Sequence, residues 1–220
     1  VYNPNDVRFG VAYKKDVMES GGVQFWDKES KLIDEENFRD FLIKRMDYVE
    51  QYRAFTHFRM LNYMNVHLGF SKTSKEVTTD YRYSINENTL KVLTDRFDFT
   101  EMVIGIRYAY KEKFIKNLRK KISLGTQYPV LKFQYSRGLE GVLDGEFSYH
   151  RYDINIEESF YTNYWGRTSI TLNAGYIDSD IPATNLFNGN GSYRVFTIYA
   201  SKSFATMRMN EFLSNRYMAL

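Results

Sequence analysis

The stretch that decides the fold runs from Met102 to Tyr110 and alternates between two kinds of side chain. Its even positions are large and apolar or aromatic: Met102, Ile104, Ile106, Tyr108 and Tyr110. Its odd positions are Val103, Gly105, Arg107 and Ala109. Successive residues of a β-strand point to opposite sides of a sheet. One face of this strand therefore meets an apolar medium, and the other meets water or a crowded interior.

The same alternation recurs along the second half of the chain. The apolar register continues through Leu131, Phe133 and Tyr135, through Tyr152, Ile154 and Ile156, and through Ile170, Leu172, Ala174 and Tyr176. Between these residues stand Lys132, Gln134, Ser136, Asp153, Asn155, Glu157, Thr171 and Asn173. Charged and amide groups at this density exclude a dry interior on the second face, because burying them without partners is costly.

Composition narrows the fold class. The 220 residues include 19 Tyr and 17 Phe, 26% are charged, and the mean hydropathy is −0.51. No stretch of about 20 apolar residues exists, which excludes a membrane protein built of helices. A barrel in an outer membrane needs only every second residue to be apolar, and it gathers aromatic residues at both interfaces. The pattern alone leaves this class open beside a soluble antiparallel sandwich or barrel.

Charge, cysteine content and the first residues of the chain set further limits. The formal charge of +3 comes from interspersed residues rather than from a basic stripe, so no nucleic-acid partner is predicted. The absence of Cys excludes disulfides and thiolate metal sites. The chain opens at Val1 without an initiator Met or a signal peptide, so we expect it to be an excerpt.

Between residues 35 and 55 the spacing of apolar residues changes from two positions to three or four. Phe38, Leu42, Met46 and Val49 recur three or four residues apart, which predicts an amphipathic helix. Asp34 would cap it, and charges along its length exclude a transmembrane helix. The sequence therefore predicts an extramembrane helical insertion near residues 35–55 that, with the long loops, contacts other envelope proteins.

Strands are expected elsewhere. The expected ranges are 7–14, 23–26, 57–71, 77–85, 99–112, 128–136, 146–161, 167–177, 193–203 and 204–213. This predicts about 8–10 strands of one antiparallel sheet. Because no internal repeat and no linker interrupts them, residues 1–220 are expected to belong to a single domain.

Residues that could carry chemistry are sparse. The chain has no G-x-S-x-G, no H-E-x-x-H and no P-loop, so no catalytic, cofactor or metal site is predicted. His57, His67 and His150 are interpreted as separate polar residues, since the pattern shows no turn that would let His57 face His67. Asp178 and Asp180 offer oxygen ligands in a polar loop, but without the spacing of an EF-hand, and calcium binding there stays an open question.

Several segments resemble one protein family. They are residues 97–115, 125–131 and 135–139, then Ile181-Pro182, Leu186-Phe187, Gly189-Asn190 and residues 210–217, with looser matches at 8–10 and 16–21. Together they resemble a family of Bacteroidota outer-membrane β-barrels of unknown function, which usually carry a carboxypeptidase-regulatory-like domain at the N-terminus. The resemblance implies an all-β, antiparallel transmembrane β-barrel in the bacterial outer membrane. This chain would be its middle-to-late part, with the N-terminal domain and the last strands outside it.

If the sheet closes, its two faces have different surroundings. The lumen-facing candidates are Arg107, Lys132, Gln134, Asp153, Asn155, Thr171 and Asn173, with Glu211 turned inward by a bulge. The lipid-facing candidates are Met102, Ile104, Ile106, Tyr108, Leu131, Phe133, Ile170 and Leu172. The polar residues would line a water-filled path or form an ion-paired plug.

Three functions remain compatible with this pattern. The first is a non-enzymatic accessory or scaffold component in envelope biogenesis, surface export or uptake, with outer-membrane lipid as its immediate partner. The second is a pore or transporter with a polar lumen. The third, a barrel protease or lipase, is disfavoured because the sequence shows no Ser/His/Asp set.

Overall fold

The computed structural model describes residues 7–22, 25, 46–78, 83–84, 93–116, 121–164, 166–188, 191–192, 204–208 and 212–220. It is all-β, and among these residues the only helical turn is the 3-10 turn η1 (Ala183–Asn185). The predicted all-β, antiparallel class is confirmed. No helix in the described ranges is long and apolar enough to cross a membrane.

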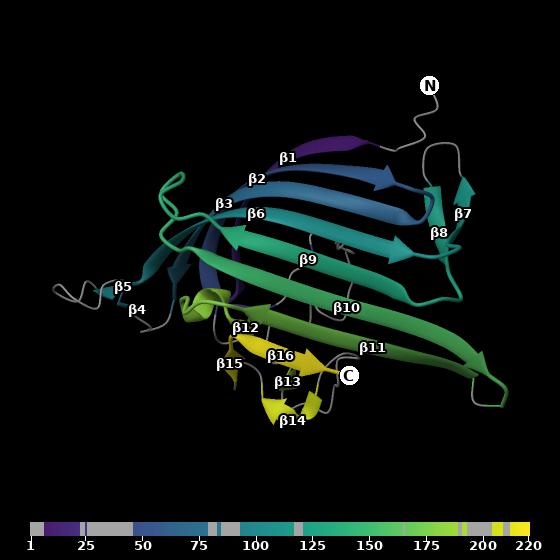
Figure 1. Cartoon of the computed structure of the whole chain (residues 1–220). Coiled ribbons are helices and arrows are strands. Elements are labelled where there is room, and N and C mark those ends of the chain that lie inside the picture. Colours follow the sequence, from purple (N-terminus) through teal and green to yellow (C-terminus); the bar gives the residue numbers. More distant parts are fainter. Residues whose placement is uncertain are drawn as a thin grey trace.

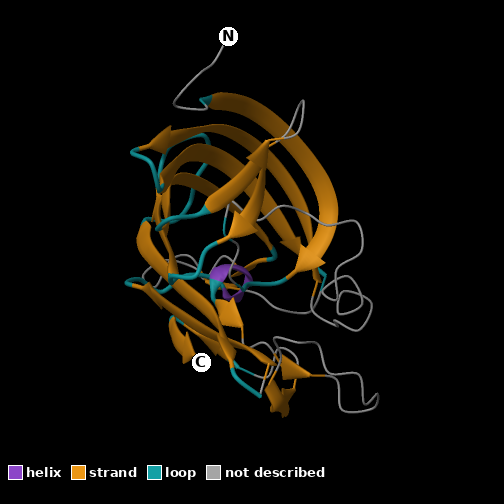
Figure 2. Ribbon diagram, turned by 90° about the vertical axis from the view of Figure 1, so that its right-hand side faces the viewer, coloured by secondary structure: helices purple, strands orange, loops and turns teal. Residues whose placement is uncertain are grey.

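One curved sheet of eight strands dominates the structure (Figure 1). In order across the sheet, its strands are β1 (Arg8–Glu19), β2 (Met46–Met60), β3 (Met64–Val77), β6 (Arg96–Ala109), β9 (Val130–Gly138), β10 (Tyr149–Thr162), β11 (Gly166–Ile177) and β16 (Arg216–Ala219). All neighbours are antiparallel. Within the described residues, β1 and β16 are open edges, so the sheet forms an arch rather than a closed barrel (Figure 2).

The remaining strands form four small pairs. These are β4 (Tyr83–Ser84) with β5 (Leu93–Thr94), β7 (Lys113–Lys116) with β8 (Lys121–Gly125), β12 (Phe187–Asn188) with β15 (Leu213–Ser214), and the parallel pair β13 (Gly191–Ser192) with β14 (Phe204–Arg208).

The connections differ between the two ends of the arch. At one end, which we call the short-turn end, β2 passes to β3 and β10 passes to β11 through tight turns, and β6 reaches β9 through the β7–β8 hairpin. At the other end, the long-loop end, long segments join β1 to β2, β3 to β6 and β11 to β16, and the shorter segment 139–148 joins β9 to β10. The two ends of the sheet are therefore not equivalent.

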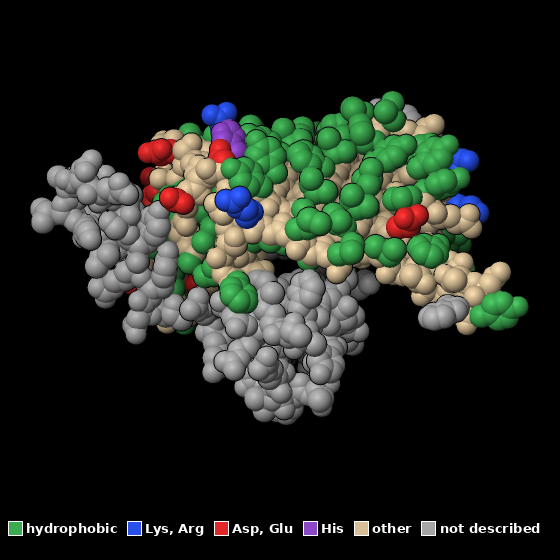
Figure 3. All heavy atoms as spheres, turned by 60° about the horizontal axis from the view of Figure 1, so that its bottom comes forward, with side chains coloured by type: hydrophobic (Ala, Val, Ile, Leu, Met, Phe, Trp, Pro, Cys, Tyr) green, Lys and Arg blue, Asp and Glu red, His purple; other side chains and the backbone are tan. Residues whose placement is uncertain are grey.

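The two faces of the arch have opposite character. On the convex face the register places Ile104 between Leu68 and Tyr135, and Ile154 between Phe133 and Ala174. Phe133 and Ile154 are each 39% exposed, so this apolar face is uncovered. Hydrophobic side chains spread broadly over the surface seen in Figure 3. On the concave face, by contrast, polar side chains are buried: Ser71, Thr73, Gln134, Ser136, Asp153 and Asn155.

The apolar core lies at the long-loop end of the concave face. It contains Phe97, Phe99, Phe147, Tyr149, Ile177, Ile181 and Phe187. The ring of Phe99 stacks on Phe147 with centroids 5.1 Å apart. Burying each large apolar side chain contributes about 1.5–3 kcal/mol. This cluster therefore fixes one end of the arch and supports the segment described below.

The predicted helix at 35–55 is wrong over its second half. Residues 46–55 belong to β2, which pairs along its length with β1 and β3. Val49, Gln51 and Arg53 share the concave face, so β2 has the two-residue period of a strand. The spacing of Met46 and Val49 also suits a helix, but pairing on both sides overrides such a short local pattern. Residues 35–45 lie outside the described residues.

The single strand predicted at 57–71 is also wrong. The chain turns at residues 61–63, where Leu61 adopts a left-handed φ of 61°. Residues 61–63 are Leu-Asn-Tyr and contain neither Gly nor Pro, so the usual turn signal is missing. The turn brings His57 directly opposite His67, against the interpretation of separate histidines.

The other expected strands have mixed outcomes. The ranges 99–112, 128–136, 146–161 and 167–177 are confirmed as β6, β9, β10 and β11 within a few residues. The range 7–14 is the first part of β1. The ranges 23–26, 77–85 and 193–203 fall wholly or mostly outside the described residues.

Candidate functional site

A loop folds back onto the concave face of the arch. Residues 181–188, which we call the inserted segment, follow β11 and contain η1, which lies inside the curve of the strands in Figure 2. Its buried side chains are Ile181, Pro182, Thr184, Asn185, Phe187 and Asn188. A loop this deeply buried needs partners for its backbone polar groups, and the concave face supplies them.

The local sequence shapes this segment. Pro182 has no backbone N–H and holds a φ of −54°, which suits it to precede a tight turn. The backbone N–H of Asn185 then donates to the Pro182 carbonyl at 2.9 Å, and that of Leu186 donates to Ala183 at 3.3 Å. The resulting turn presents the carbonyl groups of Thr184 and Asn185 to the sheet.

Two cations on the sheet hold these carbonyl groups. Lys75 of β3 donates to the Thr184 carbonyl at 2.7 Å and to Asn185 Oδ1 at 3.1 Å. Arg151 of β10 donates to the Asn185 carbonyl at 3.2 Å and to the Gly22 carbonyl at 2.7 Å. Its Nε also donates to Asp153 at 3.0 Å. Buried cations therefore join β3, β10, the end of β1 and the inserted segment.

Tyr149 extends this network to β6. Asn185 Nδ2 donates to the Tyr149 hydroxyl at 2.8 Å, and that hydroxyl donates to the Glu101 carboxylate. On the neighbouring strands, Arg53 donates to Gln51 at 2.8 Å, and Gln51 donates to Thr73 at 3.0 Å. The concave face thus carries two sets of hydrogen-bonded polar side chains, one around Asn185 and one around Gln51.

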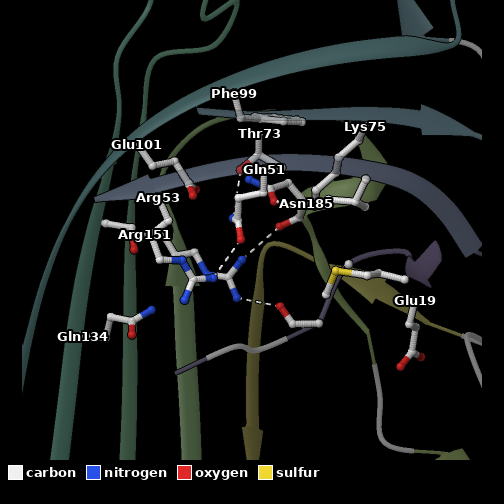
Figure 4. Close-up of a pocket in the computed structure, with 15 residues that line it drawn as sticks. Glu19, Gln51, Arg53, Thr73, Lys75, Phe99, Glu101, Gln134, Arg151 and Asn185 are labelled. Carbon is white, nitrogen blue, oxygen red and sulfur yellow. Dashed lines mark hydrogen bonds between the residues drawn. The ribbon is translucent and has the colours of Figure 1, made fainter. Parts of the chain in front are cut away.

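A cavity of about 80 Å³ lies among these side chains. Figure 4 shows Arg53 and Arg151 reaching into it from β2 and β10, with the Glu101 carboxylate pointing toward them. Lys75 and Glu19 also line it. The lining therefore combines three cations with two carboxylates. Asp153, which does not line the cavity, forms an ion pair with Arg151 and balances its charge. A polar cavity of this size suits a few ordered waters.

Two glycines allow the inserted segment to approach the end of β1. Gly21 and Gly22 have φ values of 77° and 92°, and their N–H groups donate to the carbonyls of Thr184 and Leu186 at 3.0 and 2.9 Å. A Cβ on Gly21 would lie 2.5 Å from the Leu186 carbonyl oxygen. Only glycine combines this conformation with this contact.

The structure places nearly all of the sequence-predicted site residues. On one face, the concave one, lie Arg107, Lys132, Gln134, Asp153, Asn155, Thr171 and Asn173. On the convex face lie Met102, Ile104, Ile106, Tyr108, Leu131, Phe133, Ile170 and Leu172. Glu211 lies outside the described residues. Gln134 alone of these candidates lines the described cavity.

Most of the predicted lumen-facing residues on the concave face form hydrogen bonds or ion pairs with neighbouring side chains. Lys132 lies 3.6 Å from Glu157, and Asn155 donates to Asn173 at 2.8 Å. Arg107 donates to both carboxylate oxygens of Glu112 at 2.8 Å. Burial raises the pKa of Glu112, but hydrogen bonds from Arg107 and Ser123 outweigh burial and hold that pKa below its ordinary value. The charges on this face thus largely neutralise one another.

The sequence reasoning missed the residues that hold the inserted segment. Lys75, Glu101 and Asn185 lie far apart in the chain, and only the three-dimensional arrangement brings them together. Arg151 could have been found, because it shares the parity of Asp153 and Asn155. Ile181-Pro182 formed part of the resemblance, but no structural role was attached to it.

The polar loop after β11 has a structural partner. Asp178 Oδ1 accepts hydrogen bonds from the backbone N–H of His150 at 2.7 Å and from Ser179 at 2.9 Å. Across the described part of the chain, no three His, Asp or Glu side chains gather in a way that could hold a metal ion. Asp178 therefore fastens the start of β10 to the end of β11.

A protein-family model matches more than half of the chain. Residues 59–208 match the family described as "Family of unknown function (DUF5686) C-terminal domain". No curated protein and no solved structure matches the chain. The match confirms the predicted membership of a family of unknown function, whereas the barrel and the Bacteroidota source implied by the resemblance stay predictions. This chain, with its arched antiparallel sheet and inserted segment, belongs to the DUF5686 family through its C-terminal domain.

Proposed function

We propose that the chain is part of a β-barrel in the bacterial outer membrane, where it serves as a non-enzymatic accessory or scaffold component in envelope biogenesis, surface export or uptake. The observation that carries this proposal is the inverted polarity of the arch. Apolar side chains cover the outside of the curve, and hydrogen-bonded charges lie inside it. A soluble protein rarely exposes so continuous an apolar surface, whereas lipid requires one.

The dimensions of the apolar face support a membrane setting. The stretch from Met102 to Tyr110 has the length of a transmembrane strand, about 9–11 residues. At its long-loop border the rings of Tyr135, Tyr152 and Tyr176 form a row, with centroids 5.2 and 6.5 Å apart. Rows of aromatic residues at the borders are typical of outer-membrane barrels.

The inserted segment favours a scaffold over an open channel. It occupies part of the concave face, and six hydrogen bonds from Lys75, Arg151, Asn185, Gly21 and Gly22 described above tie it to the strands. Ion pairs such as Arg107 with Glu112 fill further space on that face. Such an interior suits a rigid platform whose loops contact other envelope proteins.

Fractionation and gel mobility test the location. The full-length protein should partition with the outer membrane and migrate faster on a gel when unheated than when boiled, because closed barrels resist detergent. A folded monomer recovered without detergent from the soluble fraction would contradict the proposal.

The second candidate is a pore or transporter, favoured by the polar concave face and its cavity. Planar bilayers separate the two functions. A scaffold with the inserted segment in place should give no steady conductance. Stable single-channel steps from the reconstituted full-length protein would favour the pore instead.

A further inference from the structure

Three tyrosines and a lysine gather on the outer surface at the short-turn end. Tyr63 lies in the turn after β2, Tyr110 and Lys111 follow β6, and Tyr128 precedes β9. The ring centroids of Tyr63 and Tyr110 are 5.2 Å apart, and those of Tyr110 and Tyr128 are 5.0 Å apart. We call these four residues the rim cluster.

The lysine of the rim cluster lies against two of the rings. Lys111 Nζ is 5.2 Å from the centroid of Tyr110 and 5.6 Å from that of Tyr128. No ion pair joins Lys111 to any residue that the structure describes. The adjacent carboxylate, Glu112, does not neutralise it, since Arg107 and Ser123 already hold Glu112. The ammonium group therefore keeps its positive charge available at the surface.

The surrounding turn builds this arrangement. Thr126 donates from its hydroxyl to the carbonyl of Tyr110 and accepts from the backbone N–H of Tyr128 at 3.2 Å. Lys111 itself has a left-handed φ of 51°, which is uncommon for a residue other than glycine. One threonine thus fastens both ring-bearing segments, while the turn directs Lys111 over their rings.

The cluster continues into the apolar convex face. Tyr108 precedes it on β6 and lies opposite Leu131 of β9; the two are 39% and 43% exposed. A bound molecule at the rim cluster would therefore meet a cation and phenol hydroxyl groups at one end and an apolar surface at the other. That is the chemistry of a lipid with an anionic headgroup.

The class of lipid follows from the end of the arch at which the rim cluster lies. In outer-membrane barrels the short turns face the periplasm and the long loops face outward. The rim cluster lies at the short-turn end, where the adjoining leaflet consists of glycerophospholipids. Resting on the proposed membrane location, we propose that Lys111, Tyr63, Tyr110 and Tyr128 bind the phosphate of a phospholipid headgroup, with its acyl chains along Tyr108 and Leu131.

Binding of a short-chain phospholipid to the full-length protein in uncharged detergent micelles tests this proposal. The probe is dihexanoyl phosphatidylglycerol, and titration calorimetry gives its dissociation constant. Lys111→Gln should weaken binding about fivefold, as expected for one basic residue near a lipid headgroup. Lys72→Gln, which removes a lysine from the convex face at the long-loop end, should leave it unchanged.

Three outcomes would overturn the proposal. They are unchanged binding in Lys111→Gln, equal losses in both variants, and competition by inorganic phosphate at the concentration at which the lipid binds. The heat-dependent gel shift keeps the two proposals apart. A heat-shifting protein that fails the lipid test loses only the lipid site, whereas a protein with no heat shift loses the membrane location on which the site rests.

Discussion

The Nζ atom of Lys75 lies 2.7 Å from the carbonyl oxygen of Thr184, 109 residues further along the chain. This contact compensates a buried ammonium group with backbone and amide oxygens rather than with a carboxylate. Lys72, three residues earlier on the same strand and on its opposite face, instead lies 2.6 Å from the exposed Asp144. The two lysines of β3 therefore allow a direct comparison of a buried and an exposed partner.

Replacing Lys75 with Met should destabilise the protein by about 1–3 kcal/mol, because Thr184 and Asn185 lose the donor to their buried oxygens. The midpoint of urea unfolding in detergent measures this change. Lys72→Met is the matched control and should cost no more than about 1 kcal/mol, as is usual for an exposed ion pair. Equal effects of the two substitutions would show that the inserted segment does not depend on Lys75.

Adjacent residues on β11 test the assignment of the two faces. Leu172→Arg, on the convex face, should cost about 2–4 kcal/mol in a bilayer if it lies at the midplane. Thr171→Arg, on the concave face opposite Glu157, should be much milder. Unfolding in lipid vesicles measures both variants. Equal damage from the two would mean that both faces are dry and that the lipid assignment is wrong.

Glu112 should make stability depend on pH. Its pKa is lower in the folded than in the unfolded chain, so it stabilises the fold above its unfolded pKa and loses that contribution as the pH falls through the folded pKa. Thermal midpoints of the native protein and Glu112→Gln should therefore differ at pH 7 and converge in acid. Burial raises the pKa of Glu146, so its charged form destabilises the fold. Glu146→Gln should therefore have a higher thermal midpoint than the native protein at pH 7, and the two midpoints should converge in acid. Parallel curves for Glu112→Gln and the native protein would contradict the ion pair with Arg107.

Gly21→Ala should loosen the inserted segment. The new Cβ would meet the Leu186 carbonyl oxygen in addition to straining a left-handed backbone. Gly141→Ala is the control, since Gly141 has a φ of 75° with nothing within 4 Å of its Cβ position. Hydrogen exchange at the amides of Asn185 and Leu186 should rise in Gly21→Ala only. A similar rise in both variants would point to general destabilisation.

The strands that the sequence predicted well are those with an uninterrupted two-residue period. From Met102 to Tyr110 and from Ile170 to Tyr176, one apolar and one polar face are legible in the residues themselves. Because the register of neighbouring strands follows the same parity, the two faces of the sheet could be assigned residue by residue. The curvature of the sheet has no comparable local signal.

The predictions failed where local and tertiary preferences compete. Met46 and Val49 fit a helical spacing, yet pairing with β1 and β3 makes them part of a strand. Leu61 begins a turn in a left-handed conformation that leucine seldom adopts, so no pattern marks it. The site around Lys75 and Asn185 depends on contacts across most of the chain, which single-sequence periodicity does not contain.

The inserted segment also bears on the order in which the chain folds. Its Thr184 carbonyl accepts from Lys75 across 109 residues, whereas β2 and β3 meet across a turn of a few residues. Contacts of such large sequence separation form late, because the entropy cost of closing a long loop precedes the stabilisation that the contact provides. We expect hairpins such as β2–β3 to assemble first and the inserted segment to dock last, so that its docking reports that the arch is complete.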